Sequence, residues 1–253
     1  MSAKRLSRPA EEELSRRLRS YIQSGYLSGV VELLRDFDVD LSHYNEYGFT
    51  PLQLAASHGH LDVTSFLIDR GASLDSGTKA GGYTALHLAS NFGHESTTKF
   101  LITAGSCVDR VSGFGTTALH RAAMNGHTAV VRELLMAGVS GDVKNEEGYT
   151  ALHYAALENH IGAAKLLIAA GVRVDVMSNT GVTPLHLADH KNRTKMVTLL
   201  MTSGAVPFWN TIKETIVPSD HVSERVESYW RPKTVALQVP RLTILAAAAV
   251  PNA

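Results

Sequence analysis

One seven-residue phrase occurs five times in this chain of 253 residues. It starts with threonine, continues with alanine or proline and then leucine, and has histidine as its fourth residue in four of the five copies. Consecutive threonines of the phrase are 34, 33, 33 and 33 residues apart, at Thr50, Thr84, Thr117, Thr150 and Thr183. A fixed period of this length predicts an array of similar units, each of which buries its apolar face only by stacking on its neighbours.

The phrase Thr-Pro-Leu-His-x-Ala at this period resembles that of the ankyrin repeat family, over roughly residues 14–206. The resemblance implies an all-α solenoid of helix-turn-helix units with projecting β-hairpin loops. We expect five full repeats that follow a degenerate N-terminal capping repeat. The capping repeat would occupy residues 11–47, and the full repeats residues 48–81, 82–114, 115–147, 148–180 and 181–206, the last resembling a C-terminal cap.

Each repeat carries local signals for two short helices and a turn. The threonine stands where an N-cap belongs, and Pro51 and Pro184 follow it at the first helical position, where a missing N–H costs nothing. A second glycine, two residues before each threonine, indicates the turn between repeats. The first helix ends at a residue that tolerates a left-handed backbone, namely Gly59, Gly93, Gly126, Asn159 and Asn192.

Both ends of the array depart from the pattern. Apolar residues at helical spacing over residues 14–22, followed by Gly25, predict the first of two helices in the capping repeat. We interpret Arg16, Arg17 and Arg19 as the water-facing side of this cap. In repeat five, Asp189 replaces an alanine, as the end of a solenoid requires.

Segments outside the array give weaker signals. Residues 1–10 predict a flexible tail, although their basic residues are also compatible with a targeting or phosphorylation signal. In residues 207–253, apolar side chains at helical spacing predict one amphipathic helix over about 219–230. This tail would cover the last repeat, dock on another protein or remain disordered.

Composition excludes several classes of function. Lys plus Arg and Asp plus Glu both number 24, so no global positive field draws the chain to nucleic acid or to an anionic membrane. The first 30 residues lack the apolar core of a secretory signal, and Ile244–Val250 is too short to span a bilayer. The single cysteine, Cys107, fits a reducing compartment. We expect a monomer in the cytoplasm, with the nucleus as a second location.

Twelve histidines raise the question of metal binding or catalysis. In ankyrin repeats, the histidine of the phrase bonds to the threonine hydroxyl and to the backbone of the next repeat. The resemblance implies this role for His87, His120, His153 and His186, with Gln53 bonding less specifically in the first full repeat. His186 and His190 have a spacing that could chelate a metal, but no carboxylate or thiol at ligand spacing joins them. We therefore expect no catalytic residue, metal or cofactor.

Partner binding is expected on the concave face that hairpin tips and first helices form in this family. The candidate residues on it are Tyr47, Phe49, His58, Tyr83, Asn91, Phe92, Phe114, Met124, Asn125, Glu147, Tyr149, Leu157 and Glu158. Exposed aromatic residues at repeated positions are typical anchors for a protein partner. As an alternative, Phe49, Tyr83 and Tyr149 pack on neighbouring hairpins. Acidic residues in the fourth repeat favour a partner with an apolar centre and a basic end.

The leading hypothesis is a non-enzymatic protein-interaction module, an adaptor or scaffold, whose partner the sequence does not identify. A second hypothesis makes it the substrate-recruiting adaptor of a ubiquitin ligase or other signalling complex, with residues 207–253 as the recruiter. A third makes it an inhibitor of a transcription factor. A fourth, a cryptic enzyme or metal protein, would depend on His186 and His190.

Overall fold

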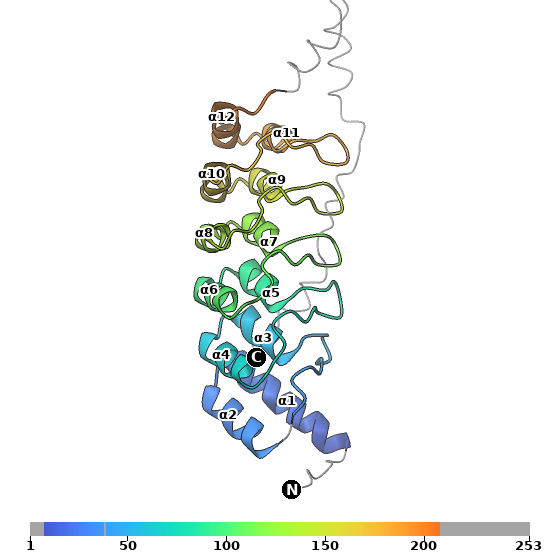
Figure 1. Ribbon diagram of the computed structural model, residues 1–253. Coiled ribbons are helices and arrows are strands. Elements are labelled where there is room, and N and C mark those ends of the chain that lie inside the picture. The colour runs from blue at the N-terminus through green and yellow to red at the C-terminus, as the bar shows by residue number, and fades with distance from the viewer. Residues whose placement is uncertain (1–7, 38, 208–253) are drawn as a thin grey trace, which may run out of the picture. The chain divides into compact units, whose positions relative to one another are not determined.

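The computed structural model describes residues 8–37 and 39–207, and this part of the chain contains twelve α-helices and no strand. The helices stack in two parallel columns (Figure 1). The inner column consists of α1 (Arg8–Ser24), α3 (Pro51–His58), α5 (Ala85–Phe92), α7 (Ala118–Met124), α9 (Ala151–Leu157) and α11 (Pro184–His190). The outer column consists of α2 (Leu27–Asp36), α4 (Leu61–Asp69), α6 (Glu95–Thr103), α8 (Thr128–Met136), α10 (Ile161–Ala169) and α12 (Thr194–Thr202).

Neighbouring helices make nearly all of the contacts between elements. Each inner helix packs on the inner helices before and after it and on the outer helix of its own pair. Each outer helix packs on its neighbours in the outer column in the same way. The residues up to Ala205 form one compact unit, whose cohesion comes from these contacts between adjacent pairs.

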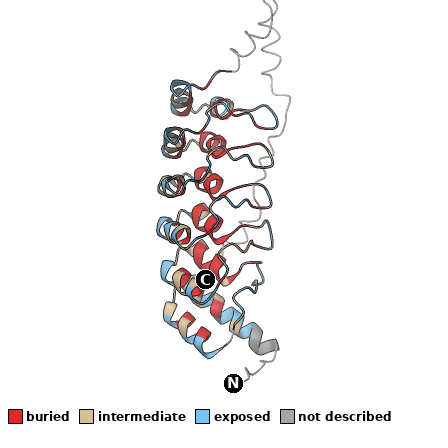
Figure 2. Cartoon of the chain, viewed as in Figure 1, coloured by how far each residue is buried: buried red, intermediate tan, exposed pale blue. Residues whose placement is uncertain are grey.

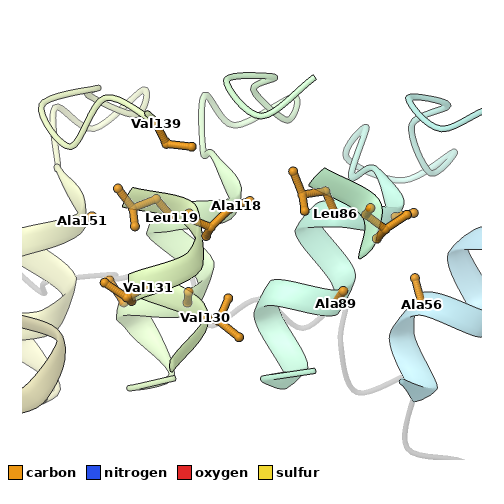
Figure 3. Packing of buried hydrophobic residues seen from close by; sticks show 14 of the residues in the cluster. Ala56, Leu86, Ala89, Ala118, Leu119, Val130, Val131, Val139 and Ala151 are labelled. Carbon is orange, nitrogen blue, oxygen red and sulfur yellow. The ribbon is translucent and has the colours of Figure 1, made fainter. Parts of the chain in front are cut away.

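The core runs along the inner column, where most side chains are buried (Figure 2). The leucine of the phrase is buried in every repeat, as Leu119 of α7 illustrates. An alanine in the middle of each inner helix from α3 to α11 is fully buried, as Ala89 of α5 illustrates, and Figure 3 shows both kinds of side chain between neighbouring helices. Small alanines let the inner helices approach closely, and leucines fill the remaining space at the density of a protein interior.

The ends of the inner helices follow from the sequence signals. Each of the five threonines has an extended backbone and forms a capping box with the residue three positions later. The glycines after α3 and α5 have the left-handed backbone conformation. Asn159 (φ 63°) and Asn192 (φ 53°) adopt it in repeats four and five, so the prediction that asparagine replaces glycine at this turn is confirmed.

Hairpin-shaped loops connect the repeats, and they form one hydrogen-bonded row. The Asn145 N–H donates to the Tyr149 carbonyl and closes one loop. Between loops, the Glu146 N–H donates to the Phe114 carbonyl at 3.2 Å and the Asn179 N–H to the Glu147 carbonyl at 3.0 Å. Each loop has too few such bonds to form a strand, so the expected β-hairpins are turns that the neighbouring loops hold in place.

The N-terminal helix differs from the expectation in its starting point. It begins at Arg8, within the segment that we expected to be a flexible tail up to residue 10. Pro9 does not prevent this, because proline in the first turn removes no helical hydrogen bond. The predicted tail helix over 219–230 and the ambiguous residues that follow it lie outside the described residues.

Candidate functional site

The histidine of the phrase joins each repeat to the next. In repeat two, His87 Nδ1 accepts the Thr84 N–H and lies 2.9 Å from the Thr84 hydroxyl oxygen. The ring proton therefore lies on Nε2, which donates to the Thr116 carbonyl at 2.9 Å. The same pair of contacts occurs at His120, which bonds to Tyr149, and at His153, which bonds to Val182.

The first and last repeats vary this arrangement. Gln53 Nε2 donates to two carbonyls of the following loop, those of Ser76 at 2.6 Å and Tyr83 at 3.3 Å. Its amide thus makes as many contacts as the His87 ring and bonds to the following loop in the same direction, so the expectation of a less specific contact stays a prediction. In repeat five, His186 Nδ1 accepts the Thr183 N–H at 3.0 Å.

A second histidine in repeats one to four bonds in the opposite direction. His94, which precedes α6, donates from Nε2 to the Ser57 carbonyl of the preceding repeat at 2.9 Å. The junctions between repeats two and three and between repeats three and four therefore each have one imidazole bond to the following repeat and one to the preceding repeat. Sequence reasoning placed these histidines in the repeat but did not predict their bonds. The equivalent contacts are His60 to Gln23, His127 to Asn91 and His160 to Met124.

Burial changes the titration of the phrase histidines. Removal from water lowers the pKa of His87, His120 and His153 to about 4 in each case. The carbonyl acceptors of their Nε2–H groups oppose this lowering, but they do not overcome it. These three side chains are consequently neutral at pH 7, which suits a structural role at the junctions.

Three of the predicted aromatic anchors are open to solvent on the concave face. Tyr47 is 50% exposed, Phe92 38% and Phe114 39%. Asn125 and Glu158 are also exposed, whereas Phe49, His58, Asn91, Met124 and Glu147 are half-buried. Tyr47 and Phe114 lie in hairpin loops, and Phe92 ends an inner helix, so the three come from the two kinds of element expected to form this face.

Three other candidates are buried, and their assignment to an open surface is wrong. Tyr83 packs on the His87 ring, and Tyr149 packs on the rings of His153 and Tyr154. The residue after the hairpin glycine therefore turns back toward the inner helix, so the packing interpretation applies to these two tyrosines. Leu157 is buried at the end of α9, an inner helix with inner helices on both sides.

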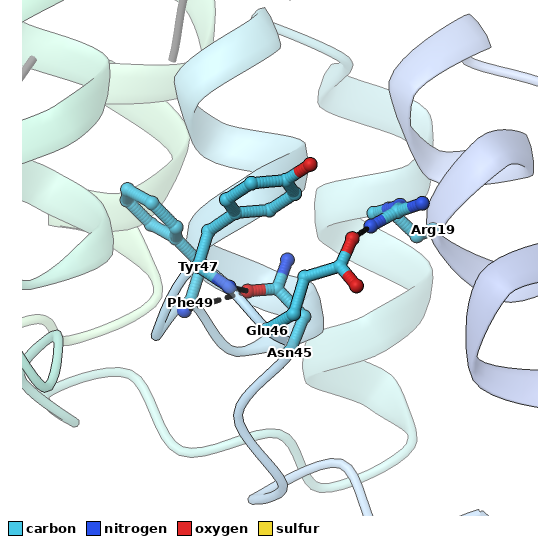
Figure 4. A network of polar contacts seen from close by, with 5 residues as sticks. All are labelled: Arg19, Asn45, Glu46, Tyr47 and Phe49. Atoms are coloured by element: carbon cyan, nitrogen blue, oxygen red, sulfur yellow. Dashed lines mark hydrogen bonds and ion pairs between the residues drawn. The ribbon is translucent and has the colours of Figure 1, made fainter. Parts of the chain in front are cut away.

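Arg19 of α1 anchors the first hairpin, which corrects its interpretation as a water-facing residue (Figure 4). Its side chain is 23% exposed, its guanidinium forms an ion pair with Glu46, and it lies 5.5 Å from the centroid of the Tyr47 ring. Asn45 Oδ1 accepts the backbone N–H groups of Tyr47 and Phe49, each at 3.0 Å. The capping helix thereby positions an exposed aromatic residue of the concave face.

Arg121 of α7 is a buried cation, only 2% exposed, at a place where the other four repeats have Leu54, Leu88, Tyr154 and Leu187. Its Nη2 donates to the Tyr83 hydroxyl, and its guanidinium carbon lies 4.4 Å from the Tyr83 ring centroid. Burial lowers its pKa. Within the described residues, no carboxylate forms an ion pair with it, and its Nη1 has no hydrogen-bond partner.

Acidic side chains lie further along the same face, in the loop between repeats three and four and after the end of α9. Glu146 and Glu158 are exposed, and Glu147 is half-buried. Burial, and then the charge of Glu146, raise the pKa of Glu147. The concave face thus changes from aromatic side chains over a buried cation in repeats two and three to carboxylates in repeat four.

In the described part of the chain, no group of three or more histidine, cysteine, aspartate or glutamate side chains lies close enough to hold a metal ion. None of the helices in the described ranges combines the length and the apolar character that a membrane crossing requires. Cys107 is exposed.

Stacked helix pairs, joined by hairpin loops that carry exposed side chains, define a helical solenoid. The family model for ankyrin repeats (three copies) matches residues 20–112, 91–178 and 119–209, which is more than half of the chain. The chain therefore belongs to the ankyrin repeat family. No curated protein matches it. Ankyrin repeats are in general protein–protein interaction modules, and the family is typically not enzymatic.

Proposed function

We propose that this chain is a non-enzymatic adaptor or scaffold that binds a protein partner on its concave face. The observation that carries the proposal is the exposure of Tyr47, Phe92 and Phe114 on a surface whose backbone is already fixed. Exposed aromatic side chains supply much of the binding energy at protein interfaces. Hydrogen bonds between loops and imidazole bonds between repeats hold this surface before a partner arrives, so little ordering is required on binding.

Two more specific functions are compatible with this surface. A substrate-recruiting adaptor of a ubiquitin ligase or signalling complex would hold its client on the concave face and recruit machinery through residues 207–253. An inhibitor of a transcription factor would use Glu146, Glu147 and Glu158 to cover a basic segment of its target. The equal numbers of acidic and basic residues favour a protein partner over nucleic acid. We further propose a monomer that acts in the cytoplasm and the nucleus.

Paired affinity purification from native lysate, read by mass spectrometry, tests the proposal. One bait is the wild-type chain, and the other carries Tyr47→Ala, Phe92→Ala and Phe114→Ala. A control bait carries Met136→Ala and Met201→Ala, which remove exposed apolar side chains from the outer helices. All three must show the same thermal melt.

We expect a partner that the wild type and the control capture and the aromatic variant loses. Capture of the same set by all three baits would contradict the proposal and would direct attention to residues 207–253. Deletion of residues 207–253 distinguishes a general adaptor or scaffold from a substrate-recruiting adaptor. For a substrate-recruiting adaptor, the ligase or signalling subunits should disappear from the captured set while the client remains.

A further inference from the structure

Arg121 has a positive charge that the described structure does not neutralise. It lies on α7, in the middle of the stack, with its guanidinium against the Tyr83 ring and Nη2 bonded to the Tyr83 hydroxyl. Its Nη1 is inaccessible to water and bonds to no atom of the described chain. Five donors in a planar fork make arginine suited to bidentate pairing, and here only part of that capacity is used.

Stability does not explain this arginine. A buried charge without a counter-charge destabilises a folded chain, and an apolar side chain of similar volume is usually preferred there. Three of the other four repeats have leucine at the equivalent place, and the fourth has Tyr154, whose hydroxyl accepts a hydrogen bond from Asn145. The fold therefore accommodates an uncharged residue at this place. The charge of Arg121 is not needed for folding and is available to pair with a counter-charge.

The surroundings of Arg121 indicate the chemistry of its counter-charge. The exposed Phe114 ring stacks on Tyr83 with centroids 6.2 Å apart, and Phe92 is exposed at the end of the neighbouring α5. An aromatic cover over a buried guanidinium suits a carboxylate that arrives between apolar side chains, because exclusion of water strengthens a charge-assisted bond. The carboxylates of Glu146, Glu147 and Glu158 lie further along the face, where a second acidic group would be repelled.

We propose that the concave face binds a peptide segment whose aspartate or glutamate side chain pairs with Arg121. Apolar side chains of the same segment pack on Phe92 and Phe114, and its basic residues lie over repeat four. Since Nη1 is covered in the free chain, binding includes a rotation of the exposed Phe114 ring and of the Tyr83 ring beneath it, and such rotations are common at interfaces. This inference rests on the proposed function, and it adds the charge pattern of the partner.

A peptide selection tests the charge pattern without knowledge of the natural partner. A phage library of random dodecapeptides is selected in parallel on the wild-type chain, on Arg121→Leu and on Arg132→Leu. Arg132 is exposed on α8 of the same repeat, so its replacement makes the same change of charge away from the concave face. Arg121→Leu installs the residue of repeats one, two and five, and we expect it to melt no lower than the wild type.

We expect binders of the wild type and of Arg132→Leu to contain an aspartate or glutamate at one position, flanked by apolar residues. That enrichment should disappear on Arg121→Leu. In calorimetry with a selected synthetic peptide, replacing its carboxylate by the amide should weaken binding to the wild type at least about tenfold and leave binding to Arg121→Leu nearly unchanged.

The inference would be overturned by the absence of an acidic position among the binders, by an acidic position that persists on Arg121→Leu, or by the absence of any binders. Preference for a phosphoserine peptide that does not require the carboxylate would also overturn it and would indicate a phosphopeptide partner. A third variant, Phe92→Ala with Phe114→Ala, separates this failure from failure of the proposed function. If the selected peptides lack an acidic position but do not bind this variant, the concave face is still the binding site. If they bind this variant as well, the binding site lies elsewhere.

Discussion

The glycine that ends an inner helix is coupled to a histidine of the next repeat. A Cβ atom at Gly126 would lie 2.4 Å from Nδ1 of His160, and Gly25, Gly59 and Gly93 face the corresponding histidines at similar distances. In repeat five, arginine replaces that histidine at position 193, and the preceding repeat ends its helix at Asn159 instead of glycine. The left-handed backbone is thus only part of the reason for glycine, because the ring of the next repeat also needs its space.

Exchange of these residues tests the coupling. Gly126→Asn keeps the left-handed backbone accessible but forces the His160 ring away from the Met124 carbonyl, so we expect a loss of about 1–3 kcal/mol in unfolding free energy. Asn159→Gly, where the next repeat has Arg193 in place of the histidine, should change this free energy by at most about 1 kcal/mol. Urea denaturation followed by circular dichroism measures both. Equal losses in the two variants would show that backbone conformation alone decides the residue at this place.

At the scale of one element, the capping helix α1 does more than cover the end of the array. Through Arg19 it contacts Glu46 and the Tyr47 ring in the first hairpin. Arg16 and Arg17, on the same helix, are exposed, as a cap predicts. The helical pattern of residues 14–22 predicts which residues are buried, but not that one of three nearby arginines reaches a loop 27 residues further along the chain.

Removal of that contact should loosen the hairpin more than the fold. Arg19→Ala should increase amide hydrogen exchange at residues 45–49, while the free energy of unfolding falls by about 1 kcal/mol or less, because the ion pair is partly exposed. Arg16→Ala is the matched control and should alter neither quantity. If Arg19→Ala leaves exchange in the hairpin unchanged, the Asn45 turn alone holds Tyr47 in position.

The buried leucine of an inner helix contributes more to the free energy of unfolding than the Arg19 contact does, because its helix packs on an inner helix on each side. Leu119→Ala should lower the free energy of unfolding by about 2–5 kcal/mol, since it leaves a cavity between α7 and its neighbours. The same denaturation measurement applies. A loss below about 1 kcal/mol would mean that the neighbouring inner helices close the space.

At the scale of the whole molecule, the repeat period predicts those features of the fold that local sequence signals determine. Threonine caps, terminal glycines and paired apolar residues indicate where helices begin, end and pack, and the structure has them there. Contacts between repeats are less predictable, because they join residues about 30 to 40 positions apart whose approach depends on how the pairs stack. The backward bond of His94 and the environment of Arg121 belong to this kind, whereas the inward turn of Tyr83 and Tyr149 involves ring contacts with the inner helix of the same repeat.

The row of buried histidines predicts how the whole array responds to acid. In the unfolded chain these imidazoles titrate near pH 6.5, whereas burial lowers the pKa of His87, His120 and His153 to about 4 in the folded chain. Between these values the unfolded state binds more protons, so stability falls as pH falls from about 6.5 to 4, by about 3 kcal/mol for each histidine. Above pH 7 all three are neutral in both states, and this contribution is constant.

Glutamine provides the control, because Gln53 fills the same place in the first full repeat. Replacement of all three histidines by glutamine should give a protein whose unfolding free energy depends much less on pH between 7 and 5, and His120→Gln alone should remove about a third of the slope. Urea denaturation at several pH values measures it. A slope that is the same in the wild type and the triple variant would assign the acid sensitivity to other groups, and the histidines would then serve only as hydrogen-bonded links between repeats.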